Sequence, residues 1–134
     1  RYMQWCDERR GAQIADLFWH DGVWEGRGGA VGGQVRGAQA IGAMFEQSPS
    51  RLTFTVHYLT NESIEVEGDR AIGTWKLFEP CTVHDRVAVW QGGRYEDEFE
   101  CRDGEWRFSR MTLFLEYRTP YDEGWLRTRF ADLP

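Results

Sequence analysis

From Arg51 to residue 118 the sequence alternates between apolar and polar residues with a period of two. This is the pattern of β-strands that bury one face and expose the other. Turn-forming pairs at Gly68-Asp69 and Asp103-Gly104 divide the stretch. The pattern predicts an antiparallel meander of four strands, over about 52–67, 70–80, 86–101 and 105–118.

Three places interrupt the alternation. We expect a bend at 61–63, where Asn61 is a bend residue, and a bulge at Gly92-Gly93. Pro80 cannot donate to a neighbouring strand and should end or distort the second strand. Residues 119–134 form a tail, whose predicted anchors are Tyr121, Trp125 and Phe130.

The first part of the chain has helical spacing instead. Apolar clusters at Tyr2-Trp5-Cys6 and Ile14-Leu17-Phe18 predict two short helices over 1–19 with a break at Gly11. A short strand over 23–27 and a glycine-rich segment over 26–37 follow. A helix over 38–47 should stop at Ser48-Pro49-Ser50. Helices followed by a meander predict one α+β domain over 1–134, with helices over the concave face of a strongly bent antiparallel sheet.

Charge and composition exclude several classes of partner. The net charge is −6 and no basic cluster exceeds two residues, so neither nucleic acid nor an acidic membrane is an expected partner. No apolar run approaches the about 20 residues that span a bilayer. Three cysteines without CxxC spacing indicate reduced thiols and a cytoplasmic protein, with neither a disulfide framework nor a zinc site.

We expect no cofactor and no metal. The glycine-rich segment has neither GxGxxG after a buried strand nor a closing Gly-Lys-Ser/Thr, so a loop over a cavity mouth is favoured over a phosphate site. The chain starts at Arg1 inside a predicted helix, so preceding residues could complete that helix.

The residues best suited to chemistry are His57 and Asp7. His57 shares a strand face with Leu59, and Asp7 lies in the first helical segment. A neutral imidazole can take a proton from carbon near neutral pH when a carboxylate stabilises the resulting cation and fixes the ring tautomer. His57 is therefore the candidate base and Asp7 its partner.

Strand faces identify a further candidate, Arg110. In 94–101 the even residues are all charged and should face water, so that Tyr95 and Asp97 face inward. In the last strand Arg110 shares a face with Trp106, Phe108, Thr112 and Phe114. An unpaired charge in such a row is costly, so Arg110 should meet an acid, with Asp97 the structural candidate, or a ligand oxygen.

The order of motifs resembles the SnoaL-like branch of the NTF2-like, cystatin-like cone superfamily. The motifs are DLFWHDGVWEG, RGAQAI, VHYLTNESIEVEGDRAIGTW, GGRYEDEFECRDGEWRFSRM and TPYDEGW, which span almost the whole chain. In pattern the chain is nearest to the group of scytalone dehydratase, bile acid 7α-dehydratase and hexachlorocyclohexane dehydrochlorinase. The motifs say little about the reaction, because the fold hosts many.

The resemblance implies site residues. The dehydratases and the dehydrochlorinase pair an aspartate of an early helix with a histidine of the first long strand, which Asp7 and His57 match. Tyr2 matches a tyrosine five residues before the aspartate, and Arg110 falls near an arginine that lines the dehydrochlorinase pocket. Where the bile acid enzyme has a further pocket aspartate, this chain offers only Glu79, and His84 matches the second histidine of scytalone dehydratase poorly.

We therefore expect a cofactor-independent lyase, a dehydratase or related eliminating enzyme, with an apolar pocket for a small aromatic or polycyclic substrate. Its predicted catalytic residues are His57, Asp7, Tyr2 and Arg110. A homodimer that packs through the outer face of the sheet is expected, with a trimer as the alternative.

Two other functions stay open. One is a non-catalytic ligand-binding or small-subunit-like module, as in ring-hydroxylating dioxygenases. The other is isomerase or polyketide cyclase chemistry. In the isomerase reading, Glu25 would be the base, with Tyr2 and either Asp97 or Tyr95 as hydrogen-bond donors.

Overall fold

The computed structural model describes residues 1–29 and 32–134. Short helices come first, and strands make up most of the remainder. In chain order the elements are α1 (Tyr2–Asp7), α2 (Gly11–Ile14), a 3-10 turn η1 (Ala15–Leu17), β1 (Phe18–Arg27), β2 (Gly33–Arg36), α3 (Ala38–Arg51), β3 (Leu52–Thr55), β4 (Tyr58–Glu67), β5 (Arg70–Val83), β6 (Val87–Arg102) and β7 (Glu105–Pro120).

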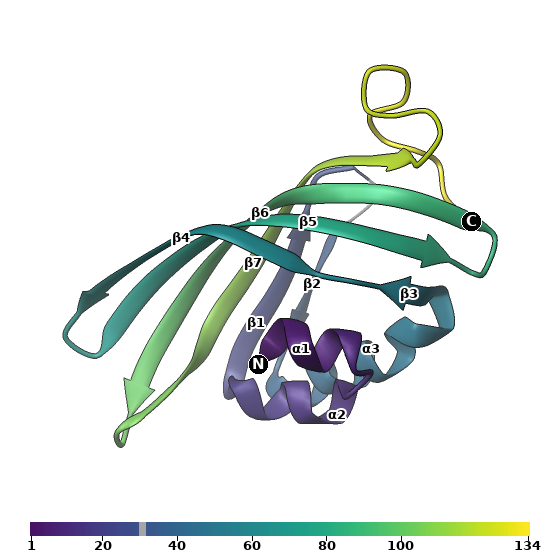
Figure 1. The fold of residues 1–134 in the computed structure, drawn as a ribbon. Coiled ribbons are helices and arrows are strands. Elements are labelled where there is room, and N and C mark those ends of the chain that lie inside the picture. Colours follow the sequence, from purple (N-terminus) through teal and green to yellow (C-terminus); the bar gives the residue numbers. More distant parts are fainter. Residues whose placement is uncertain (30–31) are drawn as a thin grey trace.

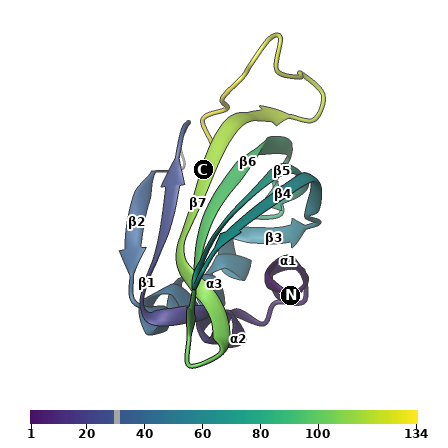
Figure 2. The same ribbon diagram turned by 90° about the vertical axis from the view of Figure 1, so that its left-hand side faces the viewer.

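The strands form one curled sheet in the order β2-β1-β7-β6-β5-β3, and β4 also pairs with β5. The pairs β4–β5, β5–β6 and β6–β7 are antiparallel, as predicted, but β1 runs parallel to β7, so the sheet is mixed. The sheet arches over the helices, which lie on its concave side (Figures 1 and 2). The expected α+β arrangement of a bent sheet over N-terminal helices is confirmed.

Two helix boundaries differ from the prediction. The first helical region ends at Leu17, because Phe18 begins β1 and pairs with Phe108 of β7. This long-range pairing overrides the helical spacing of Ile14, Leu17 and Phe18. Helix α3 does not stop at Pro49 but continues to Arg51. A proline near the end of a helix removes only one backbone donor, and the Ser50 hydroxyl donates to Gln47 O at 2.7 Å within this last turn.

The glycine-rich segment is largely a β-hairpin. Gly26 of β1 pairs with Gly33 of β2, and residues 30–31 lie outside the described part of the chain. None of the described residues of 26–37 lines the main cavity, so the expected loop over its mouth is wrong for these residues. Gly29 instead approaches the tail, where a side chain would meet the ring of Phe130.

The predicted strand over 52–67 is interrupted at Val56-His57, opposite Pro80. Val56 N–H still donates to Pro80 O at 3.2 Å, but Pro80 has no N–H to return. Strand β5 nevertheless continues through Pro80 to Val83. The expected bend lies between Thr60 and Ser63, where the register shifts and Asn61 has a positive φ of 54°.

Two bulges in the β6–β7 pair decide which way its side chains face. One is at the predicted Gly92-Gly93 position, where Glu116 is the extra residue of β7. The other is at Glu98-Phe99, where Ser109 is the extra residue. Each bulge moves the following side chains of β7 to the other face of the sheet.

The core lies between helices and sheet, and includes the fully buried Ile14, Phe18, Ile41 and Met111. The tail is anchored by the buried Ala131 and by Leu133, which packs against a smaller cluster around Cys81, Val83 and Val89. The predicted anchors Tyr121, Trp125 and Phe130 are exposed, but Trp125 packs on Tyr117 with 5.5 Å between ring centres and Phe130 forms a β-bridge with Arg118, so the prediction is confirmed in part. No helix in the described residues is long and apolar enough to cross a membrane.

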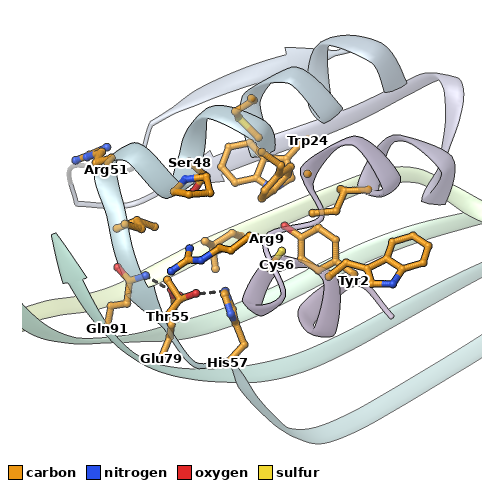
Figure 3. Close-up of a pocket in the computed structure, with 18 of the residues that line it drawn as sticks. Tyr2, Cys6, Arg9, Trp24, Ser48, Arg51, Thr55, His57, Glu79 and Gln91 are labelled. Carbon is orange, nitrogen blue, oxygen red and sulfur yellow. Dashed lines mark hydrogen bonds and ion pairs between the residues drawn. The ribbon is translucent and has the colours of Figure 1, made fainter. Parts of the chain in front are cut away.

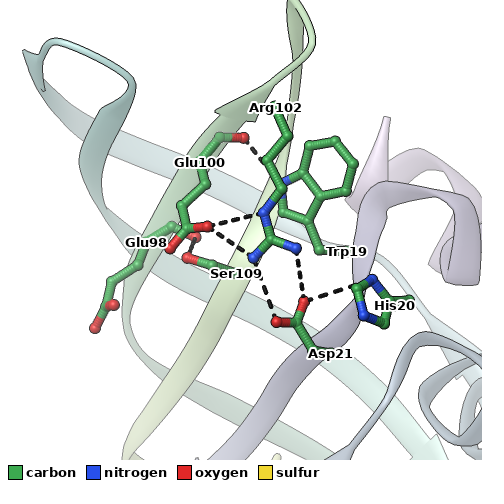
Figure 4. Close-up of polar contacts among 7 residues, drawn as sticks. All are labelled: Trp19, His20, Asp21, Glu98, Glu100, Arg102 and Ser109. Atoms are coloured by element: carbon green, nitrogen blue, oxygen red, sulfur yellow. Dashed lines mark hydrogen bonds and ion pairs between the residues drawn. The ribbon is translucent and has the colours of Figure 1, made fainter.

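A surface cluster joins β1 to β6. The Arg102 guanidinium contacts Asp21 of β1 at 3.0 Å and Glu100 of its own strand at 2.7 Å (Figure 4). The same guanidinium lies 4.8 Å from the centre of the Trp19 ring, whose N–H donates to Glu100 O at 2.9 Å. These strands are not neighbours in the sheet, so the cluster ties them across the end of β7.

Candidate functional site

A cavity of about 220 Å³ lies between the helices and the concave face of the sheet. One part of its wall is aromatic and aliphatic, and another part carries charged and amide side chains. Its lining residues include Tyr2, Trp5, Ile14, Trp24, Phe45, Tyr95 and Leu113 on the apolar side, and Arg9, Arg51, Thr55, His57, Glu79, Gln91 and Arg118 on the polar side.

Asp7 and His57, the pair predicted from the sequence, are in contact. The His57 Nδ1 lies 2.6 Å from Asp7 Oδ1, and the His57 backbone N–H donates to Asp7 Oδ2 at 3.0 Å. The Thr55 hydroxyl also donates to Asp7 Oδ1, at 3.1 Å. The His57 side chain is only 10% exposed. Asp7 therefore holds both the backbone and the ring of His57.

The local sequence explains this contact. Alternation puts His57 on the inner face together with Leu59, which packs against the core. The interruption between β3 and β4 leaves the His57 backbone N–H available to a side chain. Asp7 is the last residue of α1, and its carboxylate accepts that N–H in place of a strand partner.

Glu79 faces the other ring nitrogen of His57. Its Oε2 lies 3.5 Å from His57 Nε2 and accepts a hydrogen bond of 2.6 Å from Gln91 Nε2. Gln91 Oε1 in turn accepts one of 2.6 Å from Arg118 Nε. His57, Glu79 and Gln91 lie in a row along the sheet side of the cavity, across from Trp24 (Figure 3).

Burial controls the charge of Glu79, which is only 3% exposed. It raises the pKa of Glu79 above its ordinary value, although His57, the Gln91 hydrogen bond and Arg118 act in the opposite direction. The imidazole thus has the carboxylate of Asp7 at Nδ1 and a buried carboxyl group, that of Glu79, near Nε2. The sequence alone leaves the face of Glu79 open, and in the structure the register Tyr58–Phe78 puts residue 57 opposite residue 79.

Tyr2 also lines the cavity, as its position before Asp7 in the first helix suggested. Its side chain is buried and packs edge-on against Tyr95, with 6.3 Å between ring centres. Burial raises the pKa of Tyr2 well above its ordinary value, so the phenol keeps its proton. Tyr2 can donate a hydrogen bond but cannot serve as a base.

Arg110 does not line the cavity, and this prediction was wrong. The bulge at Ser109 turns Arg110 to the outer side of the sheet, where its Nη1 lies 2.9 Å from Glu25 Oε2. Arg110 does have an acidic partner, as expected, but the partner is Glu25 and not Asp97. The arginine of β7 that lines the cavity is Arg118, which the second bulge turns inward next to Gln91.

The same geometry removes the isomerase reading that used Glu25 as a base. Both Glu25 oxygens are engaged, by Arg27 at 2.7 Å and by Arg110 at 2.9 Å, and Glu25 does not line the cavity. Asp97 and Tyr95 do face inward, as predicted. In residues 1–29 and 32–134 no group of three or more His, Cys, Asp and Glu side chains is arranged to hold a metal ion.

Comparison with known proteins agrees with this architecture. The chain is 29% identical over 121 residues to the γ-hexachlorocyclohexane dehydrochlorinase of Sphingobium indicum UT26S, a match that covers 85% of this chain and 73% of the relative. The dehydrochlorinase LinA-type3 of Novosphingobium barchaimii LL02 superposes with a TM-score of 0.79 at 23% identity, over 98% of this chain and 87% of that one. A Nostoc punctiforme PCC 73102 protein with a cystatin-like fold superposes with a TM-score of 0.71 at 16% identity, over 86% and 83% of the two chains.

The fold is thus the cystatin-like, NTF2-like cone, and relatives of the chain are dehydrochlorinases, which are lyases. The family profile of the SnoaL-like domain matches residues 1–112, which is most of the sequence. The chain therefore belongs to the family of SnoaL-like domains.

Proposed function

We propose that this protein is a lyase that eliminates a leaving group from a small cyclic substrate without a cofactor, with His57 as the base. The observation that carries the proposal is the position of His57 in the wall of the cavity, with Asp7 at Nδ1 and Glu79 near Nε2. The dehydrochlorinase relatives support the reaction class.

His57 would remove a proton from a carbon atom of the substrate through Nε2. The 2.6 Å contact favours the tautomer in which Nδ1–H donates to Asp7, which leaves the Nε2 lone pair free. As the ring takes up the proton, the Asp7 carboxylate stabilises the imidazolium that forms. Asp7 acts through the imidazole, so it is a positioning residue.

Glu79 would supply a proton to the leaving group. Hydroxide is a poor leaving group and needs protonation, whereas chloride leaves as the free anion. A buried carboxyl group with a raised pKa suits the first task, so Glu79 favours elimination of water. The buried phenol of Tyr2 is a further donor that lines the same cavity.

The volume of the cavity limits the size of the substrate. At about 220 Å³ it lies below the range of about 300–1,000 Å³ that is usual for ligand pockets. A compound with one ring suits this volume better than a polycyclic one. The aromatic side chains of Trp24, Phe45 and Tyr95 would pack against that ring.

A turnover assay tests the proposal. The wild type is incubated with γ-hexachlorocyclohexane, with release of chloride as the readout, and with single-ring β-hydroxy carbonyl compounds, with absorbance of the new alkene as the readout. Loss of a general base should slow the active reaction about 10²–10⁴-fold in His57→Ala, and Asp7→Asn should slow it as well. A His57→Ala protein with wild-type rates would refute the assignment, and binding of these compounds without turnover would indicate a binding module.

A further inference from the structure

Arg118 is a buried cation whose donors are mostly unused. Only 6% of the residue is exposed, and it lines the cavity. Its Nε donates to Gln91 Oε1 at 2.6 Å. Within residues 1–29 and 32–134 its two terminal amino groups donate no hydrogen bond, and its guanidinium forms no ion pair with a carboxylate. Neither terminal nitrogen is sealed off by the protein, so their donors are open to the acceptors of a ligand in the cavity.

Other charges around the cavity do not compensate Arg118. Arg9 and Arg51 also line it, and neither forms an ion pair within the described part of the chain. Burial lowers the pKa of Arg118, and the positive charge of Arg51 acts in the same direction, whereas Cys81 and Glu79 oppose it. The carboxylate of Asp7 is already engaged by His57 and Thr55.

Among the described residues Glu79 is the one remaining acid in the cavity wall, and it forms no direct hydrogen bond or ion pair with Arg118. The amide of Gln91 lies between them and accepts from Arg118 while it donates to Glu79. Burial raises the pKa of Glu79, which Arg118 opposes, and the three arginines of the cavity wall, Arg9, Arg51 and Arg118, outnumber this one acid. The polar side of the cavity is therefore cationic in a protein whose net charge is −6.

We infer that the ligand of this cavity carries a carboxylate, and that the two terminal amino groups of Arg118 bind it. A guanidinium edge with two parallel donors matches the two oxygens of a carboxylate. The inference rests on the proposed function and narrows its substrate class to single-ring carboxylic acids. Gln91 and Glu79 separate Arg118 from His57, so the carboxylate lies away from the base and the ring extends toward the aromatic wall.

A matched pair of ligands tests the inference without turnover. Benzoate and benzamide have nearly the same shape, but only benzoate is an anion. Calorimetric titration of the wild type should show tighter binding of benzoate by about 10–100-fold, the usual gain of charge-assisted over neutral hydrogen bonds. Arg118→Gln should abolish this preference. Arg118→Lys keeps the positive charge but not the two parallel donors, so it should retain part of the preference. Arg110→Gln is the matched control, because Arg110 lies on the same strand outside the cavity.

The inference is overturned if the wild type binds benzamide as tightly as benzoate, or binds neither up to about 10 mM. It is also overturned if folded Arg118→Gln keeps the preference for benzoate. His57→Ala separates this result from the proposed function, because loss of the base should stop turnover, whereas the preference for benzoate over benzamide depends on Arg118. Wild-type turnover in His57→Ala together with Arg118-dependent benzoate binding would refute the lyase mechanism alone.

Discussion

The protonation state of Glu79 has the largest effect on which elimination reactions the cavity can support. If its neutral form delivers a proton to a leaving hydroxyl group, elimination of water must slow as pH rises through the pKa that burial has raised. In Glu79→Gln, elimination of water should fall about 10²–10⁴-fold, whereas elimination of chloride should be much less affected. Rates measured against pH on a hydroxylated and a chlorinated substrate check this. Equal losses on both substrates would contradict the role of Glu79 as an acid.

The buried carboxyl group of Asp97 should make the stability of the fold depend on pH. It is buried, one of its oxygens has no hydrogen-bond partner in the described residues, and burial raises its pKa to about 8. This pKa is higher in the folded than in the unfolded chain, so the folded chain holds the Asp97 proton more tightly. The contribution of this proton to the free energy of unfolding is complete below about pH 4 and is lost as pH rises toward about 8. Over that window Asp97 should lower the free energy of unfolding by about 1.4 kcal/mol per pH unit.

Urea unfolding of the wild type and Asp97→Asn over this pH range measures the effect. Asparagine cannot ionise, so the free energy of unfolding of the variant should rise relative to that of the wild type as pH rises. A difference that stays constant from about pH 5 to about pH 9 would show that Asp97 does not titrate in this window.

At the level of elements, the bulge at Gly92-Gly93 fixes the inward turn of Arg118. A β-carbon at Gly93 would collide with the backbone oxygen of Phe114, so the backbone would have to move. Gly93→Ala should lower the free energy of unfolding by about 2–4 kcal/mol. Gly32→Ala is the control, because no atom of the described residues outside its chain neighbours lies within 4 Å of its added carbon. Equal unfolding midpoints for the two variants in urea would contradict the close approach at the bulge.

The bulges also explain which parts of the molecule could be predicted. Period-two alternation was enough to find the meander, both turns and the inward faces of His57, Tyr95 and Asp97, because each depends on residues close in sequence. The choice between Arg110 and Arg118 depended on one extra residue in each bulge, and Ser109 gives no sequence signal for the first. The parallel pairing of β1 with β7 depends on distant residues, which local spacing does not report.

For the whole molecule, we still expect a homodimer that packs through the outer face of the sheet. Tyr58, Phe78 and Trp90 form an aromatic row on that face, with Phe78 stacked on Trp90 at 5.5 Å between ring centres. Such exposed apolar groups are typical of protein interfaces. Light scattering should give twice the monomer mass of 15.7 kDa, and Phe78→Glu should shift the protein toward the monomer. A monomeric wild type would contradict this expectation, and a trimer would support the alternative.

The proposed mechanism depends on the ring of His57, which lies between the first helix and the sheet. Nitrogen-15 NMR of this ring in the wild type and in Asp7→Asn reads its tautomer directly. We predict that the neutral wild-type ring carries its proton on Nδ1, donated to Asp7, and that this preference weakens in the variant. A wild-type ring protonated on Nε2, with no lone pair free to take a proton from carbon, would contradict the proposed mechanism.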